Sequence, residues 1–546
     1  MSNKKLRIIP LGGLGEVGKN MMVYEYDEDI LIVDTGIMFP ENDMLGIDYI
    51  IPDFDYVVKK RDHVRGIVIT HGHEDHVGAI RHVLDQINAP VYGTPLTRGL
   101  AEVKLARNGQ AQKADLRTVN AGETVKIGAF QVDFFHVCHS IPDSVGLGIE
   151  TPAGLVVHSG DYKFDHTPVD SWPSDYAKLS EFSKRGVLAL LSDSTNAERA
   201  GWTASERVID AALLPVFTGA NGRILVVTFA SLISRMQQVA NAAIRFKRKL
   251  AFAGMSMVDN VKIARKLGYL DIPDKVIVTI DQALKMKDNE VVIMCTGSQG
   301  EPTSILGRLS AGTNRQFDLK PADTVILSSH PIPGNEEVVY RTINRLFQRG
   351  VNVLYEAIAP VHVSGHASQE EMKLLLHLTR PKYFVPIHGE LRMLKQHAHL
   401  AEQVGIPREN IAVIENGQVV EFENGKMKLA ERIPGGYVFV DGSGVGDVST
   451  SVMREREALS RDGIVLVNLT LEKSSGHLSQ VPEIISRGFI LPADGESIMG
   501  TLRKRITEVV SRADGNLQTD IEMLAKTILY NETKRRPMVF VTISRA

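Results

Sequence analysis

The chain has 546 residues, a formal net charge of −3 and 2 cysteines. At roughly 150 residues per domain, this length predicts three to four domains. So few cysteines exclude a disulfide framework, the near-neutral charge argues against a protein that coats nucleic acid, and no apolar run reaches the roughly 20 residues of a membrane span. We therefore expect a folded cytoplasmic protein that does not associate with membranes.

Short strands dominate the first part of the chain. Alternating or apolar runs bounded by turn residues predict strands at residues 6–10, 21–26, 30–34, 66–70, 130–137 and 154–159. Helical periodicity is confined there to residues 78–87 and the segment after Thr97.

From about Gly222 the pattern changes to strands that alternate with longer helices. Buried strands are predicted at 223–228, 251–254, 276–280, 291–296, 324–329 and 352–356, and helices at 231–249, 256–267 and 335–349. This alternation is typical of βαβ units and a parallel sheet. A helix at 368–378, a strand at 383–387, a helix at 390–404 and short strands follow.

The last part of the chain begins with a break in these patterns. Residues 433–447 are rich in glycine and include a proline, which predicts a linker or a long loop. Beyond it, strands at 463–471 and 537–543 and helices at 497–512 and 520–531 predict a small α/β domain.

Metal-ligand side chains crowd the end of the predicted strand 66–70. His71, His73, Asp75 and His76 lie within six residues, and imidazole with carboxylate suits zinc, manganese or iron. On extended backbone, His71 and His73 face the same way and can share one ion. A turn after His73 can present Asp75 and His76 to a neighbouring ion.

Three more candidate ligands follow other predicted strands. They are Asp34, His139 and Asp161. Each one alone is more often a turn or capping residue, but an α/β fold tends to build its sites at strand ends. Together with the histidine-rich segment they predict a metal centre.

The pattern His-x-His-x-Asp-His, a later histidine, an aspartate in Ser-Gly-Asp and an aspartate ending an early strand resembles the metallo-β-lactamase superfamily. The resemblance implies an αββα sandwich with a two-metal site. The implied members are His71, His73 and His139 on one ion, Asp75 and His76 on the other, Asp161 bridging, and Asp34 orienting a ligand histidine.

One histidine ligand is still missing from this set. The best candidate, His388, lies beyond the α/β block of residues 212–359. This arrangement resembles the β-CASP group of nucleic-acid-processing enzymes, whose further signatures match Asp193 after a strand and His366 at the return from the block. Members that act on DNA commonly have valine at the last position, so His388 points toward RNA.

Within that group the chain resembles the ribonuclease J family. The matching segments are 10–20, 70–76, 328–336 and 362–366, and the resemblance covers about residues 6–450 and extends more weakly into the tail. It implies a metal-dependent ribonuclease of single-stranded RNA in RNA maturation and decay. The implied enzyme is a 5′-to-3′ exonuclease that prefers a 5′-monophosphate and also an endonuclease. A homodimer or dimer of dimers is implied, with other RNA-degradation proteins as further candidate partners.

The resemblance also implies roles for single residues. His366 would donate a proton to the leaving 3′ oxygen or stabilise it, Asp193 would hold His366 or a ligand histidine, and Asp75 belongs to the catalytic set. The candidates for binding the 5′-phosphate are Ala230, Ser231, His362, Val363, Ser364, Gly365 and His366. Asp48 and Asp441, both in predicted loops, are candidates for a separate calcium ion.

The predicted architecture is α/β. A metallo-β-lactamase sandwich is split into residues 1–211 and 361–432, a β-CASP domain spans 212–360, a linker spans 433–455, and a C-terminal α/β domain spans 456–546. Two divalent ions per chain are expected, zinc, manganese or both.

Other functions remain open at this point. A DNA nuclease of the same superfamily is one, a small-molecule metallo-hydrolase another and a catalytically silent scaffold a third. The inserted domain argues against a small substrate, and the complete ligand set argues against a silent scaffold.

The glycine-rich segment 13–18 spells the dinucleotide fingerprint G-x-G-x-x-G, with Asp34 at the expected distance. That motif requires a helix next, whereas residues 21–26 alternate like a strand. We therefore interpret the segment as a tight loop near the metals.

Overall fold

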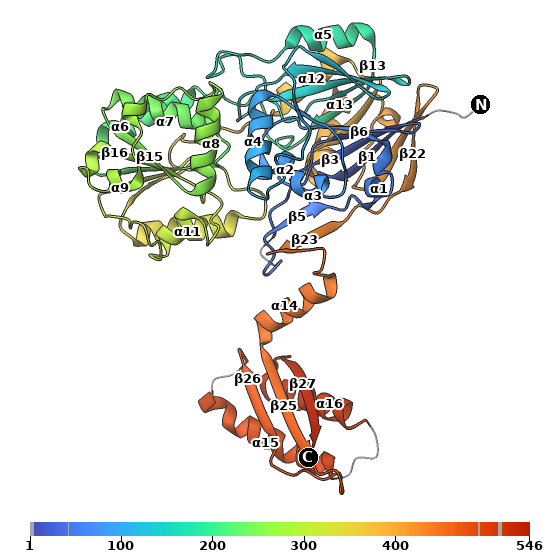
Figure 1. Ribbon diagram of the computed structural model, residues 1–546, viewed down its shortest axis with the longest axis vertical. Helices are drawn as coiled ribbons and strands as arrows, with labels where there is room; N and C mark the ends of the chain where they lie inside the picture. The colour runs from blue at the N-terminus through green and yellow to red at the C-terminus, as the bar shows by residue number, and fades with distance from the viewer. Residues whose placement is uncertain (1–4, 42, 490–491, 512–515) are drawn as a thin grey trace. The chain divides into compact units, whose positions relative to one another are not determined.

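The computed structural model describes residues 5–41, 43–489, 492–511 and 516–546 (Figure 1). Contacts between residues divide the chain into two compact units. One comprises Met1–Phe39 and Tyr49–Val438, and the other comprises Pro40–Asp48 and Phe439–Ala546. Among the described residues, no helix is long and apolar enough to cross a bilayer.

Two sheets form the larger part of the first unit. An eight-stranded sheet has the order β22-β21-β1-β3-β4-β6-β7-β8 and a six-stranded sheet the order β19-β13-β12-β11-β10-β9. The strands of the first are β1 (Leu6–Gly12), β3 (Met21–Tyr26), β4 (Asp29–Val33), β6 (Val64–Val68), β7 (Val91–Gly93), β8 (Leu116–Thr118), β21 (Gln418–Glu423) and β22 (Lys426–Arg432). Those of the second are β9 (Thr124–Ile127), β10 (Phe130–His136), β11 (Val145–Thr151), β12 (Gly154–His158), β13 (Val187–Asp193) and β19 (Tyr383–Ile387).

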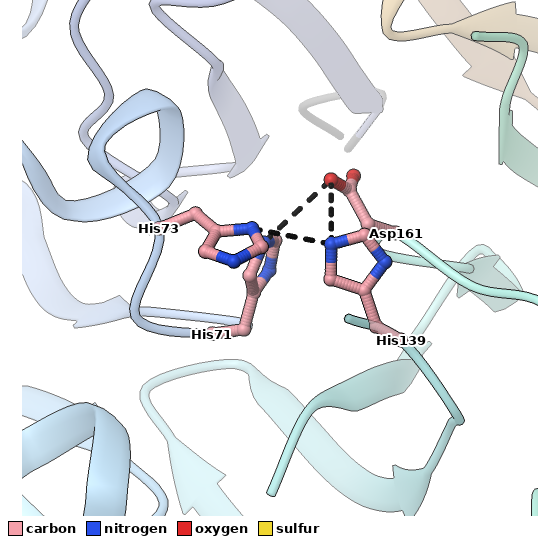
Figure 2. Close-up of side chains that lie close together, drawn as sticks. All are labelled: His71, His73, His139 and Asp161. Atoms are coloured by element: carbon pink, nitrogen blue, oxygen red, sulfur yellow. Dashed lines mark hydrogen bonds and ion pairs between the residues drawn. The ribbon is translucent and has the colours of Figure 1, made fainter. Parts of the chain in front are cut away.

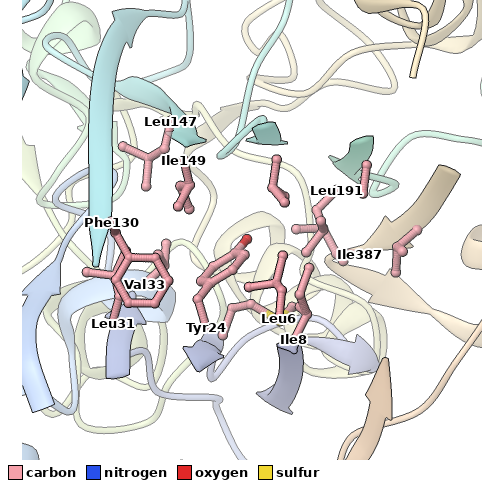
Figure 3. Packing of buried hydrophobic residues seen from close by; sticks show 14 of the residues in the cluster. Leu6, Ile8, Tyr24, Leu31, Val33, Phe130, Leu147, Ile149, Leu191 and Ile387 are labelled. Carbon is pink, nitrogen blue, oxygen red and sulfur yellow. The ribbon is translucent and has the colours of Figure 1, made fainter. Parts of the chain in front are cut away.

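The inner faces of these sheets share one apolar core. Leu6, Tyr24 and Leu31 of the first sheet belong to the same buried cluster as Phe130 and Leu147 of the second (Figure 3). The outer face of the six-stranded sheet is covered by helices whose apolar residues cluster with it. They are α5 (Tyr176–Arg185), α12 (Gln369–Thr379) and α13 (Leu391–Gln403). The predicted sandwich is confirmed.

The inserted block folds around a parallel sheet of the order β15-β16-β14-β17-β18, as its alternating pattern predicts. Its strands are β14 (Ile224–Val227), β15 (Lys249–Ala253), β16 (Val291–Cys295), β17 (Thr324–Leu327) and β18 (Asn352–Leu354). Separate apolar clusters line its two faces. The main helices are α6 (Val208–Gly219), α7 (Ile233–Arg245), α8 (Met255–Lys266), α10 (Ile305–Ser310) and α11 (Glu336–Gln348).

One strand predicted for this block is wrong. Residues 276–280 form only an isolated bridge, between Ile277 and Leu250. Thr279 instead caps the short helix α9 (Ile280–Ala283) through a capping box with Gln282. This local hydrogen bonding starts a helix where the apolar run alone favoured a strand.

The second unit is built on a sheet of the order β26-β25-β27. Its elements are α14 (Thr450–Asp462), β25 (Ile464–Leu471), β26 (Glu483–Arg487), α15 (Pro492–Val510), α16 (Leu517–Thr533) and β27 (Met538–Arg545). The segment 433–455, predicted as a linker, contains β23 (Tyr437–Asp441), β24 (Gly444–Val445) and the start of α14. Because Asp441 pairs with Gly444 across a two-residue turn, the glycines there make a hairpin.

Candidate metal centre

Parallel strands bring distant parts of the sequence to one edge of each sheet. Val33 pairs with Val68 in the first sheet, so Asp34 and the segment after Val68 leave at the same edge. Asp193 pairs with Ile387 in the second sheet, which places it beside His388. The candidate ligands therefore meet although they lie far apart in the chain.

His71, His73, His139 and Asp161 form one cluster of metal-ligand atoms (Figure 2). His73 Nδ1 lies 3.1 Å from His71 Nε2 and 3.2 Å from His139 Nε2. Asp161 Oδ2 lies 3.6 Å from His71 Nε2 and 3.7 Å from His139 Nε2. We call His71, His73 and His139 the first ligand set.

The first ligand set is held in the neutral form. Burial lowers the pKa of His73 to about 4 and the pKa of His71 and His139 well below the ordinary value. Neutral imidazole nitrogens that converge at such short distances offer lone pairs to a common point. This is the donor chemistry that a divalent cation such as Zn²⁺ requires.

Asp75, His76 and His388 form a second ligand set around the same Asp161. Asp161 Oδ2 lies 3.2 Å from His76 Nε2, and Asp161 Oδ1 lies 3.1 Å from His388 Nδ1. Among the described residues, buried His388 Nε2 has no hydrogen-bond partner, and it lies 3.4 Å from Asp75 Oδ2. The set therefore offers two imidazoles and one further carboxylate beside the shared one.

Charges in the second ligand set differ from those in the first. Burial disfavours the charged form of His76 and His388, but Asp161 and other nearby carboxylates outweigh it and raise the pKa of both imidazoles well above the ordinary value. The same histidines hold the pKa of Asp161 well below its usual range, against the effect of burial. Without metal, these groups are ion pairs.

Asp34 supports both ligand sets through hydrogen bonds. Its Oδ2 accepts a hydrogen bond from His76 Nδ1 at 2.7 Å. Its carboxylate also accepts from the backbone N–H and the hydroxyl of Thr70, whose oxygen lies 3.1 Å from His71 Nδ1. A carboxylate that orients a ligand histidine in this way fixes its ring and tautomer.

His366 lies at the edge of this centre, in the loop that returns from the inserted block. Its Nδ1 donates to Asp193 Oδ2 at 2.8 Å. Burial disfavours its charged form, but Asp193 outweighs this effect and raises the pKa of His366. Asp193, Asp161, His366 and His388 also form a third cluster of candidate ligand atoms.

Hydrogen bonds fix the return loop on several sides. The Gly365 carbonyl accepts from His139 Nδ1 at 2.8 Å, which joins the loop to the first ligand set. The His366 carbonyl accepts from Asn196 Nδ2 at 3.0 Å and from the Thr203 hydroxyl at 2.7 Å. Sequence reasoning assigns no role to Asn196 or Thr203, although Asn196 lies only three residues after Asp193.

The residues predicted to bind phosphate lie in two places. Ala230 and Ser231 precede α7, and His362, Val363, Ser364 and Gly365 lie in the return loop. Arg235 of α7 links these places, because its Nη1 donates to the Val361 carbonyl at 2.9 Å. The Ser364 oxygen accepts from Asn196 Nδ2 at 2.8 Å, which leaves the hydroxyl hydrogen available to a ligand.

The two candidates for calcium lie in the second unit. Asp441 Oδ2 pairs with Arg456 Nη2 at 2.6 Å, and Asp48 Oδ2 accepts the Gly442 N–H at 2.8 Å. Neither belongs to a cluster of three candidate ligands in the described part of the chain. The Arg456 guanidinium supplies the positive charge that Asp441 needs, and the calcium ion stays a prediction.

Comparisons with protein-family models match nearly the whole chain. The model of the metallo-β-lactamase superfamily matches residues 14–200. The ribonuclease J β-CASP domain matches 221–346, the RNA specificity domain of Zn-dependent metallo-hydrolases matches 350–412, and the ribonuclease J C-terminal domain matches 451–546. The protein is thus a metallo-β-lactamase-type hydrolase with an inserted β-CASP domain.

Similar proteins narrow this class. Ribonuclease J2 of Bacillus subtilis is 40% identical, over 99% of this chain and 99% of its own. Ribonuclease J 1 of Streptococcus pyogenes is 42% identical, over 97% of this chain and 96% of its own. The chain belongs to the ribonuclease J family, and this makes it a metal-dependent ribonuclease.

A solved structure shares the fold. It is titled a protein of unknown function from Enterococcus faecalis V583, and it matches 76% of this chain and 100% of its own with a TM-score of 0.54. Its sequence identity is 14%.

Proposed function

We propose that this chain degrades single-stranded RNA from the 5′ end, prefers a 5′-monophosphate, and also cuts internally. The observation that carries the proposal is the pair of ligand sets that share Asp161 beside the His366–Asp193 pair. One side of this centre adjoins the loop that contains Ser364 and Gly365. The same place thus combines a metal centre, an acid and candidate phosphate donors.

The donors present fit two divalent cations, either zinc or manganese. His71, His73 and His139 would hold one, Asp75, His76 and His388 the other, and Asp161 both. When bound, such cations neutralise charge on phosphoryl oxygens and lower the pKa of water. Asp34 keeps His76 oriented for this role by accepting from its Nδ1.

His366 supplies the proton that the leaving 3′ oxygen needs. Asp193 raises the pKa of His366 and accepts from its Nδ1, so the imidazolium is favoured and its other nitrogen is turned away from Asp193. A positioned general acid of this kind typically contributes about 10²–10⁴-fold to the rate. Thr203 and Asn196 hold the His366 backbone during the transfer.

The 5′-phosphate would be bound by the Ser364 hydroxyl, the Gly365 backbone N–H and the donors at the start of α7. Backbone N–H groups at a helix N-terminus suit phosphate. Such a pocket sets the register, because it fixes the distance from the 5′ end to the scissile bond. Losing one hydrogen bond to a charged group costs about 1.5–3 kcal/mol. Ser364→Ala should therefore reduce the preference for 5′-monophosphate over 5′-hydroxyl RNA by about tenfold or more.

One time course tests this proposal. Metal-replete protein is incubated with single-stranded RNA carrying a labelled 5′-monophosphate, with the same RNA carrying a 5′-hydroxyl, and with DNA of the same sequence. We expect immediate release of labelled mononucleotide from the phosphorylated RNA alone, abolished by a chelator. Early internal fragments would mean that endonuclease action dominates. Cleavage of the DNA at an equal rate would contradict the proposal.

We also propose that the protein is a cytoplasmic homodimer or dimer of dimers. The support is the resemblance of the tail to the ribonuclease J C-terminal domain over residues 451–546. Light scattering of the full chain on a sizing column measures the mass directly. A monomeric mass over the whole concentration range would contradict this part.

A further inference from the structure

The glycine-rich loop between β1 and β3 has no role in the function proposed above. It runs from Gly12 to Asn20 and was set aside as a dinucleotide motif, because the strand β3 follows it. In the structure it lies against the metal centre, and Gly12, Asn20, His76, Asp161 and His388 line a common pocket there.

One end of this loop holds the turn that contains Asp75 and His76. The Asn20 backbone N–H donates to the Asp75 carbonyl at 3.0 Å, and the Asn20 side-chain amide donates to the same carbonyl at 3.1 Å. The amide nitrogen also lies 3.2 Å from His76 Nε2. Asn20 is largely buried, so both bonds are shielded from water. A single residue therefore fixes the backbone between two ligands.

The other end of the loop holds His388. The Gly13 carbonyl accepts from the Gly389 N–H at 3.2 Å, directly after the ligand. Next to it, β2 (Leu14–Gly15) pairs in parallel with β20 (Gly389–Glu390). His388 itself has a φ of 50°, a left-handed conformation that a non-glycine residue adopts only when its surroundings impose it. The loop supplies part of that constraint.

A buried ion pair and its hydrogen bonds tie the loop together between these ends. Lys19, fully buried, pairs with Glu16 Oε1 at 2.7 Å. The same oxygen accepts from the Gly13 N–H at 3.1 Å and from Asn416 Nδ2 at 2.8 Å. A buried ion pair is retained only where further hydrogen bonds satisfy it, as they do at Glu16.

Glycine is required at position 13, because the loop backbone there passes close to the Asn20 side chain. A Cβ on Gly13 would lie 2.1 Å from Asn20 Oδ1, and its φ is +88°. Among the described residues, no hydrogen bond joins this loop to His71, His73 or His139. The loop therefore acts on the second ligand set and not on the first.

We propose that the loop from Gly12 to Asn20 is a brace for the second ligand set and that Asn20 is its positioning residue. This inference rests on the proposed function, which assigns one ion to each ligand set. Removing a group that orients metal ligands typically costs about 10–100-fold in metal affinity. In Asn20→Ala, the second ion should bind at least about tenfold more weakly, with the first ion unchanged.

The test measures metal binding by the full chain. Chelator-treated protein is titrated with Mn²⁺, and equilibrium dialysis gives the number of ions and their affinities. Electron paramagnetic resonance separates an isolated Mn²⁺ from a coupled pair. Asn314→Ala is the matched control, because the Asn314 amide also donates to a backbone carbonyl, that of Phe317, in the inserted block. This control should bind both ions as the wild type does.

Double variants show which ion is affected. Combined with His388→Ala, Asn20→Ala should add little, because the second set is already broken. Combined with His73→Ala, it should weaken the remaining ion by about tenfold or more. The opposite pattern would overturn the inference.

An isosteric variant separates folding from positioning. Asn20→Leu keeps the size of the side chain, but its side chain can neither donate to the Asp75 carbonyl nor bind a cation, so it should weaken the second ion as alanine does. If Asn20→Leu or Asn20→Ala binds both ions like the wild type, the brace is refuted. If the wild type itself fails to bind two ions, the proposed metal centre is what fails.

Discussion

The two ligand sets that share Asp161 differ in what they hold before any metal arrives. The first set presents three neutral imidazoles, because burial lowers the pKa of each. The second set holds protons, because carboxylates raise the pKa of His76 and His388. Protons therefore compete with metal at the second set and not at the first. Around Asp161, the first set can therefore bind a cation directly, whereas the second set must lose protons before it binds one.

The two sets also differ in how the chain assembles them. His71, His73 and His139 all precede the inserted block, whereas His388 follows it, at the end of β19, which pairs with β13. The second set therefore forms only when both parts of the sandwich have folded together. Asp34 and the Gly12–Asn20 loop both hold residues of the second set in place.

The largest effect is expected from breaking the second set. His76→Ala removes a ligand at the place where Asp34 and Asp161 converge. Metal ions contribute several kcal/mol to the transition state, and each 1.4 kcal/mol is a factor of ten, so RNA cleavage should fall by at least about 10³-fold. RNA binding and the circular dichroism spectrum should stay unchanged.

A histidine outside the centre is the control for this variant. His399 is exposed on α13, and His399→Ala should cleave RNA at the wild-type rate. Cleavage by His76→Ala within tenfold of the wild type would remove the second ion from the mechanism.

A smaller effect is expected from changing His366, which belongs to neither ligand set. His366→Ala should reduce the rate of cleavage by about 10²–10⁴-fold, because it removes the general acid. Both ions should remain bound, which distinguishes this variant from His76→Ala. Metal analysis of the purified protein, run beside single-turnover kinetics, tests both statements. Loss of an ion from His366→Ala would make His366 a ligand instead.

Much of the fold could be predicted from local sequence. The bounds of β3 and β19 match the predicted strands 21–26 and 383–387, because the first segment alternates like a strand and the second is a short apolar run. Patterns of this kind fail where hydrogen bonding decides the structure. The capping box at Thr279 starts a helix at the end of a predicted strand, and the turn after Asp441 makes a hairpin within a predicted linker.

The candidate site likewise has ligands that the local sequence predicts and ligands that only the fold brings together. His71, His73, Asp75 and His76 lie in one short segment, so their clustering is visible without a fold. The pairing of His388 with them depends on β19 lying beside β13, and it was accessible only through a family resemblance. Asn20 was not predicted, because its contact with the Asp75 carbonyl arises from packing between distant loops.

An intermediate effect, on metal affinity, is expected from Asp34, which hydrogen-bonds to a ligand histidine. Asp34→Asn should weaken the second ion by about 10–100-fold, because Asp34 accepts directly from His76 Nδ1. The first ion should change less, since Asp34 reaches His71 only through Thr70. The Mn²⁺ titration used for Asn20→Ala measures both affinities. Equal weakening of the two ions would mean that Asp34 acts on the whole cluster and not on one set.

The smallest effect, and the most direct test of the comparison, is the release of protons on metal binding. At pH 7 the imidazoles of His76 and His388, with raised pKa, carry protons in the metal-free protein, and a cation must displace them. The first set carries none, since its pKa values are lowered, that of His73 to about 4. Calorimetry in buffers of different ionisation enthalpy should give about two protons for the second ion and about none for the first. The affinity for the second ion should therefore fall as the pH is lowered, while the affinity for the first stays constant down to the lowered pKa values. Equal proton release by both ions would show that the two sets do not differ in the way that their charges imply.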